Sequence, residues 1–246
     1  MTAIAAHRGG ALLWPENSRI AFENAARLPV DQVEFDIHPS RDGELVVIHD
    51  AMLERTTDGE GPVAERDWAG LSRLTLNHTG GQGLLRLEEL CDIFRPTAIT
   101  LRLEIKADRR EQRYPGLEAR VLAALAAAGM AGRTVITSFH AETVAEVARA
   151  GPAMRPIWLV APLVQRALGL ARCIAVAGDI GAGAIGLRGD LADAGAVAAI
   201  RAAGLSPGCW AVNTPAAIAA ALALGVDVFT TDRPDLALAL RAAARG

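Results

Sequence analysis

The sequence predicts an α/β fold, a closed (β/α)8 barrel of the TIM type with a small insertion after the second strand. Three observations support this. Short apolar runs typical of strands alternate with Ala- and Leu-rich helical runs along nearly the whole chain. Eight such units fill 246 residues, the usual length for this barrel. Consecutive parallel strands joined by helices require right-handed crossovers, and eight regular units favour closure over an open doubly wound sheet.

Each element follows from its local pattern. The predicted strands are residues 2–7, 32–38, 98–105, 133–138, 155–160, 184–188, 208–213 and 226–231. The predicted helices are residues 18–28, 116–129, 141–150, 162–177, 190–203 and 214–225. Residues 50–87 fit neither pattern, because they contain the loop-like stretches TTDGEGPV and LNHTGGQG. We interpret 50–87 as an insertion within a single domain that spans 1–246.

Composition restricts the possible partners. A chain that is 51% hydrophobic and 22% charged is typical of a globular protein, and its net charge of −3 provides no basic field for nucleic acid. We expect no membrane insertion, because no apolar run reaches the roughly 18 residues that span a bilayer. We also expect no secretory signal, and Cys91, Cys173 and Cys209 are isolated, which favours reduced thiols and a cytoplasmic location. The expected partner is a small-molecule substrate, and a homodimer is a possible assembly.

Polar residues gather where the predicted strands end, which is where barrel enzymes build their active sites. In strand order they are His7 and Arg8; Glu34, Asp36 and His38; His49 and Asp50, after the run VVIHD; Glu104 and Lys106; Ser138 and Phe139; Trp210 and Asn213; and Thr230, Thr231 and Asp232. Because side chains alternate along a strand, the members of each pair spaced two apart share one face. The sequence therefore predicts a dense polar cluster at one mouth of the barrel.

Three carboxylates in this cluster indicate a metal site. Glu34 and Asp36 come from the second strand and Glu104 comes from the third. Bringing them together without a cation would raise their pKa values by mutual repulsion. A hard divalent ion with oxygen ligands resolves this, so we expect Mg²⁺ or Ca²⁺ rather than zinc.

The histidines and cations of the cluster favour phosphoester chemistry. His7 and His49 come from separate strands, and two imidazoles suit one general base and one general acid. Arg8 and Lys106 supply positive charge for a phosphate oxygen. Lys106 is the single lysine among 25 basic residues, which suggests a site where a compact ammonium is needed. Together these groups describe phosphodiester cleavage better than acyl or hydride transfer.

Other polar residues have simpler interpretations. We interpret His78 and His140 as structural. The role of His38 is left open, and one option is support of the site, because His38 is a strand-end neighbour of Asp36. Trp210 is either core or a wall for an organic group. Turn or helix-cap positions are expected for Asp50, Asp58 and Asp232. The stretch GAGAIG at 181–186 precedes a strand and opens no helix, so dinucleotide binding is not expected.

The motifs HRGG…PENS, VEFDIHPSRDGELVVIHD, LERTTDGEGPV, LEIK, TSF, WAVNT and GVDVFTTDRPD resemble the glycerophosphodiester phosphodiesterases, in order and over essentially the full chain. The resemblance implies a β/α barrel in which His7 and His49 are the acid and base, and Glu34, Asp36 and Glu104 hold a divalent metal. It also implies phosphate contacts from Arg8 and Lys106. Glu16 and Asn17 would order the first loop and, with Trp210 and Asn213, border the substrate.

The implied reaction is hydrolysis of a glycerophosphodiester, such as glycerophosphocholine or glycerophosphoethanolamine, to glycerol 3-phosphate and an alcohol. The glycerol hydroxyl can attack first and give a cyclic phosphate that water then opens. Two alternatives stay open: a related barrel phospholipase D or lyase that releases the cyclic phosphate, and a non-catalytic phosphate-binding barrel. The chain departs from the family pattern at Ser18, at Ala211 and in LLRLEEL, which bears on the substrate-facing loop.

Overall fold

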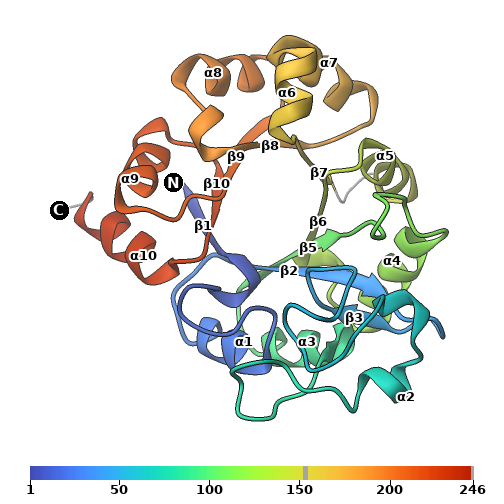
Figure 1. Cartoon of the computed structure of the whole chain (residues 1–246). Helices are drawn as coiled ribbons and strands as arrows, with labels where there is room; N and C mark the ends of the chain where they lie inside the picture. Colours follow the sequence, from blue (N-terminus) through green and yellow to red (C-terminus); the bar gives the residue numbers. More distant parts are fainter. Residues whose placement is uncertain (152–154, 245–246) are drawn as a thin grey trace.

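The computed structural model describes residues 1–151 and 155–244 and has the predicted fold class, a closed barrel of eight parallel strands with helices around it (Figure 1). The barrel strands are β1 (Ala3–Ala6), β2 (Gln32–Pro39), β5 (Thr100–Ile105), β6 (Thr134–Ser138), β7 (Ile157–Leu159), β8 (Ala184–Arg188), β9 (Ser206–Trp210) and β10 (Val228–Thr231). Each overlaps one of the eight predicted strands. β1 pairs in parallel with both β10 and β2, and these pairings close the barrel.

The register of the second and third barrel strands brings acidic residues together. β2 and β5 pair over six residues, with Asp36 opposite Glu104 and Glu34 opposite Arg102. These side chains alternate with Val33, Phe35 and Ile37, which are fully buried under the surrounding helices. Because successive side chains of a strand point to opposite faces, Glu34 and Asp36 point into the barrel.

β2 continues beyond the end of β1 and there pairs with a strand outside the barrel. β3 (Leu45–Val47) runs antiparallel to Ile37–Pro39, and β4 (Leu85–Arg86) pairs with β3. The chain between β3 and β4 contains a 3-10 turn at Val63–Glu65 and the short helix α2 (Trp68–Leu71). It has a small apolar core of its own, formed by Val46, Ile48, Leu53, Val63, Leu71, Leu76 and Leu84.

The helices follow the predicted order with two differences. They are α1 (Arg19–Ala25), α3 (Leu87–Phe94), α4 (Leu117–Ala127), α5 (Ala141–Ala150), α6 (Pro162–Leu168), α7 (Leu170–Asp179), α8 (Ala194–Ala202), α9 (Pro215–Leu224) and α10 (Pro234–Ala243). The single helix predicted over 162–177 is wrong, because Gly169 adopts φ 75° and ψ 156° and separates α6 from α7. The predicted helices also did not include α3, which precedes β5, or α10, which packs beside α9 and β1.

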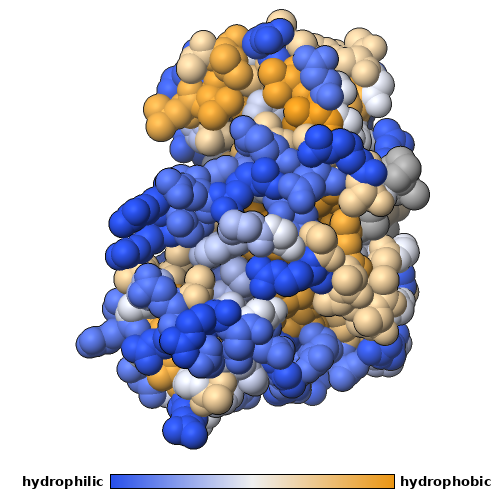
Figure 2. Space-filling model, turned by 90° about the vertical axis from the view of Figure 1, so that its right-hand side faces the viewer, coloured by the Kyte–Doolittle hydropathy of each residue, from blue (hydrophilic) through white to orange (hydrophobic). Residues whose placement is uncertain are grey.

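The outer surface is unevenly polar. Figure 2 shows hydrophilic residues over most of one side and hydrophobic residues gathered at its upper edge, over the helices at the top of Figure 1. Leu163 and Leu168 of α6 are exposed, and none of the residues of this helix is fully buried. Within residues 1–151 and 155–244, no helix has the length and apolar character to cross a membrane.

The core between the sheet and its helices contains an aromatic cluster. Phe22 of α1 is fully buried and lies edge-on to Phe35 of β2, with ring centroids 6.2 Å apart, and to Phe94 of α3, at 6.1 Å. This cluster fixes α1 and α3 against the strand that carries Glu34 and Asp36.

We predict that Phe22→Ala lowers the free energy of unfolding by about 3–5 kcal/mol, because it removes a fully buried ring and leaves a cavity. Urea denaturation followed by circular dichroism measures the change. Leu163→Ala is the control, since its side chain is 74% exposed and its loss is expected to cost within about 0.5 kcal/mol. Equal losses in the two variants would contradict this account of the core.

Candidate active site

A cavity of about 470 Å³ opens at the C-terminal mouth of the barrel. The predicted site residues that line it are His7, Arg8, Glu16, Glu34, His49, Glu104, Lys106, Trp210 and Asn213. Asn17 and Asp36, the two others, are almost fully buried and contact residues of the lining. The structure thus brings all of the predicted site residues to one place.

The loop after β1 has left-handed backbone conformations, and one of its N–H groups contacts a carboxylate of the cavity. Arg8 adopts a left-handed conformation with φ 50°, and its backbone N–H donates to Glu34 Oε2 at 3.0 Å. Gly9 follows with φ 82°, and a Cβ there would lie 2.8 Å from the Cβ of Ala21 in α1. Only glycine allows this close approach of loop and helix.

Three buried carboxylates form the floor of the site. Glu34, Asp36 and Glu104 are 3%, 0% and 7% exposed, and each offers an oxygen within 4.8 Å of the others. They are held from several sides. Glu34 accepts from the Arg8 backbone, Asp36 accepts from Asn17 Nδ2 at 2.9 Å, and Glu104 accepts from Lys106 Nζ at 2.8 Å.

Within this cluster, the pKa values of Glu34 and Asp36 are shifted in opposite directions. Burial, together with the neighbouring charge of Asp36, raises the pKa of Glu34 to about 7. Burial also acts to raise the pKa of Asp36, but the positive charges of Lys106, His49 and Arg8 outweigh it and hold that pKa far below its usual range. The neighbouring cations therefore favour the ionised form of Asp36, but they do not fully compensate a negative charge at Glu34.

The donor set fits a hard divalent cation. The three groups supply only carboxylate oxygens, which Mg²⁺ and Ca²⁺ prefer. Asn17 Oδ1 is buried and accepts no hydrogen bond within the described chain, and the buried Oδ1 of Asp36 has no hydrogen bond there and meets Lys106 Nζ only in an ion pair at 3.5 Å. Unpaired buried acceptors are costly, and a cation among them would satisfy the requirement. We conclude that this acidic cluster can bind a divalent metal.

His7 lies at one side of the carboxylates and is oriented by Asp232. Its Nδ1 lies 2.6 Å from Asp232 Oδ1, and its Nε2 lies 3.8 Å from Glu34 Oε2. Burial alone would lower the pKa of His7, but the charge of Glu34 and the hydrogen bond to Asp232 raise it overall. The interpretation of Asp232 as a cap or turn residue is therefore wrong: its carboxylate fixes the ring, and Asn213 holds it in turn.

His49 lines the same cavity and has a parallel arrangement. Its Nδ1 lies 2.6 Å from Asp50 Oδ1, so the turn interpretation of Asp50 is also wrong. Arg55, from the segment between β3 and β4, donates to Asp50 and to both carboxylate oxygens of Glu16. The sequence analysis missed Arg55, although it lies within the quoted motif LERTTDGEGPV.

His38 supports the site without reaching the cavity floor. The ring is buried, its Nε2 donates to the backbone carbonyl of His49 at 3.0 Å, and its Nδ1 accepts from the Tyr114 hydroxyl at 3.0 Å. Burial lowers the pKa of His38 to about 4, so the ring stays neutral near pH 7. Its contact with the carbonyl fixes the backbone at His49, in agreement with a supporting role.

Glu16 and Asn17 order the first loop. Glu16 accepts from Arg8 Nη1 at 3.0 Å as well as from Arg55, and thereby connects the first loop with the insertion. Asn17 has φ 54° and its backbone N–H donates to the Arg8 carbonyl at 3.1 Å. Through these contacts and the Asn17 Nδ2 bond to Asp36, the two residues position Arg8 and Asp36, and Glu16 also borders the cavity.

The wall opposite the carboxylates is apolar. Trp210 lies edge-on to Phe139, with ring centroids 5.3 Å apart, and Leu159 and Leu12 continue the wall. Two further polar residues border the same cavity, Thr137 and the buried Arg102, which donates to Gln32 Oε1 at 3.1 Å. Sequence patterns gave no reason to single these two out, since each occupies an ordinary strand position.

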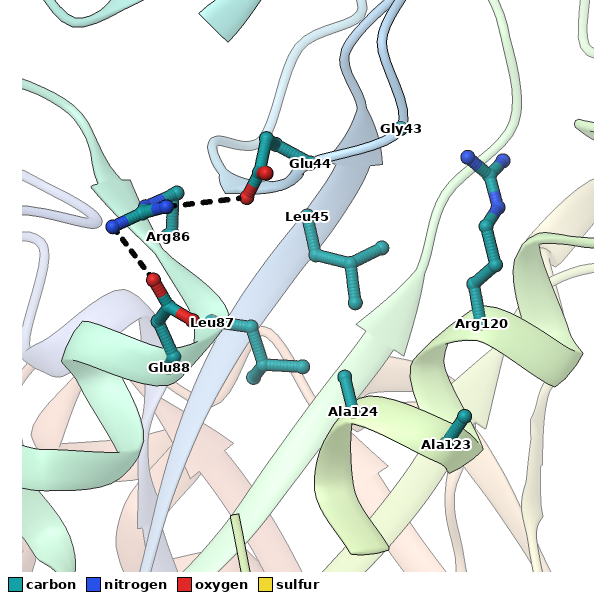
Figure 3. Close-up of a pocket in the computed structure, with 9 residues that line it drawn as sticks. All are labelled: Gly43, Glu44, Leu45, Arg86, Leu87, Glu88, Arg120, Ala123 and Ala124. Atoms are coloured by element: carbon teal, nitrogen blue, oxygen red, sulfur yellow. Dashed lines mark hydrogen bonds and ion pairs between the residues drawn. The ribbon is translucent and has the colours of Figure 1, made fainter. Parts of the chain in front are cut away.

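Another pocket lies on the outside of the barrel, away from this chemistry. It measures about 300 Å³ and is bordered by α3, α4 and the turn between β2 and β3 (Figure 3). Its floor is formed by Leu45, Leu87 and small side chains of α4, and at its rim Arg86 pairs with Glu44 and Glu88. These ions neutralise one another, so this pocket has no reactive group comparable to those of the barrel mouth.

Comparisons with known proteins agree with this geometry. The model of the glycerophosphoryl diester phosphodiesterase family matches residues 7–236. A glycerophosphodiester phosphodiesterase from Bacillus altitudinis is 30% identical over 251 residues, with 98% of each chain covered. A crystal structure from Agrobacterium tumefaciens, provisionally named a glycerophosphoryl diester phosphodiesterase, has a TM-score of 0.97 and 40% identity, covering 100% of this chain and 99% of its own.

An Oleispira antarctica phosphodiesterase, solved with its product sn-glycerol-3-phosphate, has a TM-score of 0.81 at 22% identity. The match covers 98% of this chain and 97% of that one. At this level of identity, the likeness shows that the two proteins share a fold.

We predict that the protein binds one Mg²⁺ or Ca²⁺ ion and that Glu34→Gln weakens this binding at least tenfold, or by about 1.4 kcal/mol. The reason is that the substitution removes one charged oxygen ligand while it keeps the side-chain size. Isothermal titration calorimetry measures the affinity. Glu44→Gln, at the outer pocket, is the control and should bind like the unaltered protein; unchanged affinity in Glu34→Gln would contradict the assignment.

Proposed function

The chain belongs to the glycerophosphoryl diester phosphodiesterase family and is an enzyme of that class, and from this premise we propose its specific reaction. It hydrolyses glycerophosphodiesters, such as glycerophosphocholine or glycerophosphoethanolamine, to glycerol 3-phosphate and an alcohol, in a reaction that depends on a divalent metal. One observation carries this proposal: two histidines, each fixed through Nδ1 by a carboxylate, flank a cluster of three buried carboxylates.

The product found with the O. antarctica phosphodiesterase supports the substrate class. That protein shares the fold and was solved with sn-glycerol-3-phosphate, the product expected from a glycerophosphodiester. The cavity here offers similar chemistry, with cations for a phosphate and an apolar wall for the carbon atoms of a glycerol group. A small phosphodiester, rather than a polymer, is the substrate that such an enclosed mouth suits.

The two histidines divide the proton transfers between them. Because a carboxylate occupies Nδ1 in each ring, Nε2 is the atom that faces the substrate. His7 takes the proton of the attacking hydroxyl, which belongs to the glycerol group or to water. His49 gives a proton to the departing alcohol oxygen, so the bond from phosphorus to that oxygen breaks without forming a free alkoxide.

The charged residues orient the phosphate. Arg8 and Lys106 lie on either side of the acidic cluster, and their positive charges attract the phosphate oxygens as negative charge grows there. Glu34, Asp36 and Glu104 would hold Mg²⁺ or Ca²⁺, which supplies Lewis-acid polarisation of a phosphate oxygen when bound. Trp210 packs against the glycerol carbons, and Asn213 keeps Asp232 in place behind His7.

We propose that residues 1–246 work as one catalytic domain, because Arg55 of the 50–87 insertion holds both Asp50 and Glu16. A cytoplasmic location is supported by three buried cysteines that are free thiols. A homodimer stays a prediction that size-exclusion chromatography with light scattering can check.

The direct test is an assay for glycerol 3-phosphate released from glycerophosphocholine and glycerophosphoethanolamine. We expect release with Mg²⁺ or Ca²⁺ and none after treatment with EDTA, with recovery when the metal is added back. Release of only a cyclic phosphate would favour the lyase alternative. Absence of any product at all metal concentrations would rule out the proposed reaction.

We further predict that His7→Ala and His49→Ala each lower kcat by about 10²–10⁴-fold, since each removes a general acid or base. Steady-state kinetics measure the loss, and circular dichroism checks that the fold is intact. Glu44→Gln provides the control, because the outer pocket that Glu44 borders shares no residue with the catalytic cavity. Near-normal turnover in either of the first two variants would refute the acid–base roles.

A further inference from the structure

A second cavity of about 550 Å³ opens beside the catalytic cavity, and the function proposed above gives it no role. His49, Glu104, Lys106 and Phe139 line both cavities. His7, by contrast, lines only the catalytic cavity. The two spaces therefore meet at His49 and at the edge of the acidic cluster, and the two histidines are not equivalent.

A phosphodiester has two ester arms that diverge from one phosphorus atom. With the phosphorus beside Glu104 and Lys106, one arm can extend into each cavity, since both residues border both spaces. The attacking and departing oxygens lie roughly in line on opposite sides of the phosphorus. The arm in the second cavity meets His49 but not His7, so its oxygen is the one that His49 can protonate.

The catalytic cavity suits the glycerol arm. Leu159 and Trp210 form an apolar surface for its carbon atoms. The buried hydroxyl of Thr137, a residue that borders the same space, has no hydrogen-bond partner within the described chain. Because an unpaired buried hydroxyl is costly, a ligand hydroxyl in its vicinity would be favourable.

The second cavity combines apolar surface with charged groups, several of which come from the loop after β5. Asp108 accepts the backbone N–H groups of Arg110 and Gln112 at 2.8 Å, which sets the shape of this loop. Arg109 and Glu111 lie along the opening, and Glu111 reaches His140 at 3.6 Å. Charges of both signs on a partly open cavity favour a hydrophilic group over a long hydrocarbon chain.

We propose that the second cavity binds the alcohol that leaves the diester, and that it selects small polar alcohols such as amino alcohols and polyols. In the reaction, the bond from phosphorus to the alcohol oxygen breaks, its electron pair stays on that oxygen, and His49 Nε2 supplies the proton. The attacking oxygen forms the new bond to phosphorus and gives its proton to His7. This inference rests on the proposed phosphodiesterase function.

The test uses cavity-filling substitutions on each side. Ala161 borders the second cavity but not the catalytic one, whereas Ala11 borders the catalytic cavity but not the second. We compare Ala161→Phe with Ala11→Phe in the full chain, using glycerophosphoethanolamine, glycerophosphocholine and glycerophosphoinositol. These substrates share the glycerol arm. The leaving alcohol grows from ethanolamine through choline to inositol, and the first two carry a positive charge whereas inositol is neutral.

We expect Ala161→Phe to lower kcat/KM in order of alcohol size, with a loss for glycerophosphoinositol at least tenfold greater than for glycerophosphoethanolamine, mainly through KM. Ala11→Phe should lower all three by a similar factor. If circular dichroism shows that Ala161→Phe does not fold, Ala107→Leu, on the same cavity, replaces it.

Equal losses or no loss in the second-cavity variant, or size-graded losses in Ala11→Phe, would overturn the assignment of the alcohol. These results are distinct from failure of the proposed function itself. In that case, the unaltered protein would hydrolyse none of the three substrates.

Discussion

The mutual repulsion of three carboxylates inside the barrel is the constraint on which the site depends. The three side chains, Glu34, Asp36 and Glu104, come together because β2 and β5 pair with Asp36 opposite Glu104. They are buried beneath the barrel mouth and are therefore shielded from bulk water. The protein offsets part of this charge with Arg8 and Lys106, and the oxygen ligands of the cluster suit a divalent cation. The first loop is tied to the cluster through the Arg8 backbone and the Asn17 side chain.

Each histidine is held by a different part of the chain. Asp232, after the last barrel strand, fixes His7 on the first, so closure of the barrel is itself a requirement of the site. Asp50 fixes His49, and Arg55 of the insertion ties Asp50 to Glu16 in the first loop. The insertion therefore connects the two histidine arrangements of the site, and its own small core keeps Arg55 in place.

Much of this could be predicted from local sequence pattern. The period of two in VEFDIH placed Glu34 and Asp36 on one face, and strand–helix alternation located all eight barrel strands. The supporting contacts could not be predicted in this way, because an aspartate after a strand looks the same whether it caps a turn or, like Asp232, orients a ring 225 positions away. The break at Gly169 was missed because a glycine inside an apolar helical pattern is often tolerated.

The most direct measurement of the central claim is a crystal structure with Mn²⁺ and sn-glycerol 3-phosphate, in which anomalous scattering locates the metal. We predict a single ion among oxygens of Glu34, Asp36 and Glu104, with the phosphate bound to it and with His7 and His49 on opposite sides of the phosphorus. A phosphate bound elsewhere, or a metal ion that contacts none of these three side chains, would contradict the account.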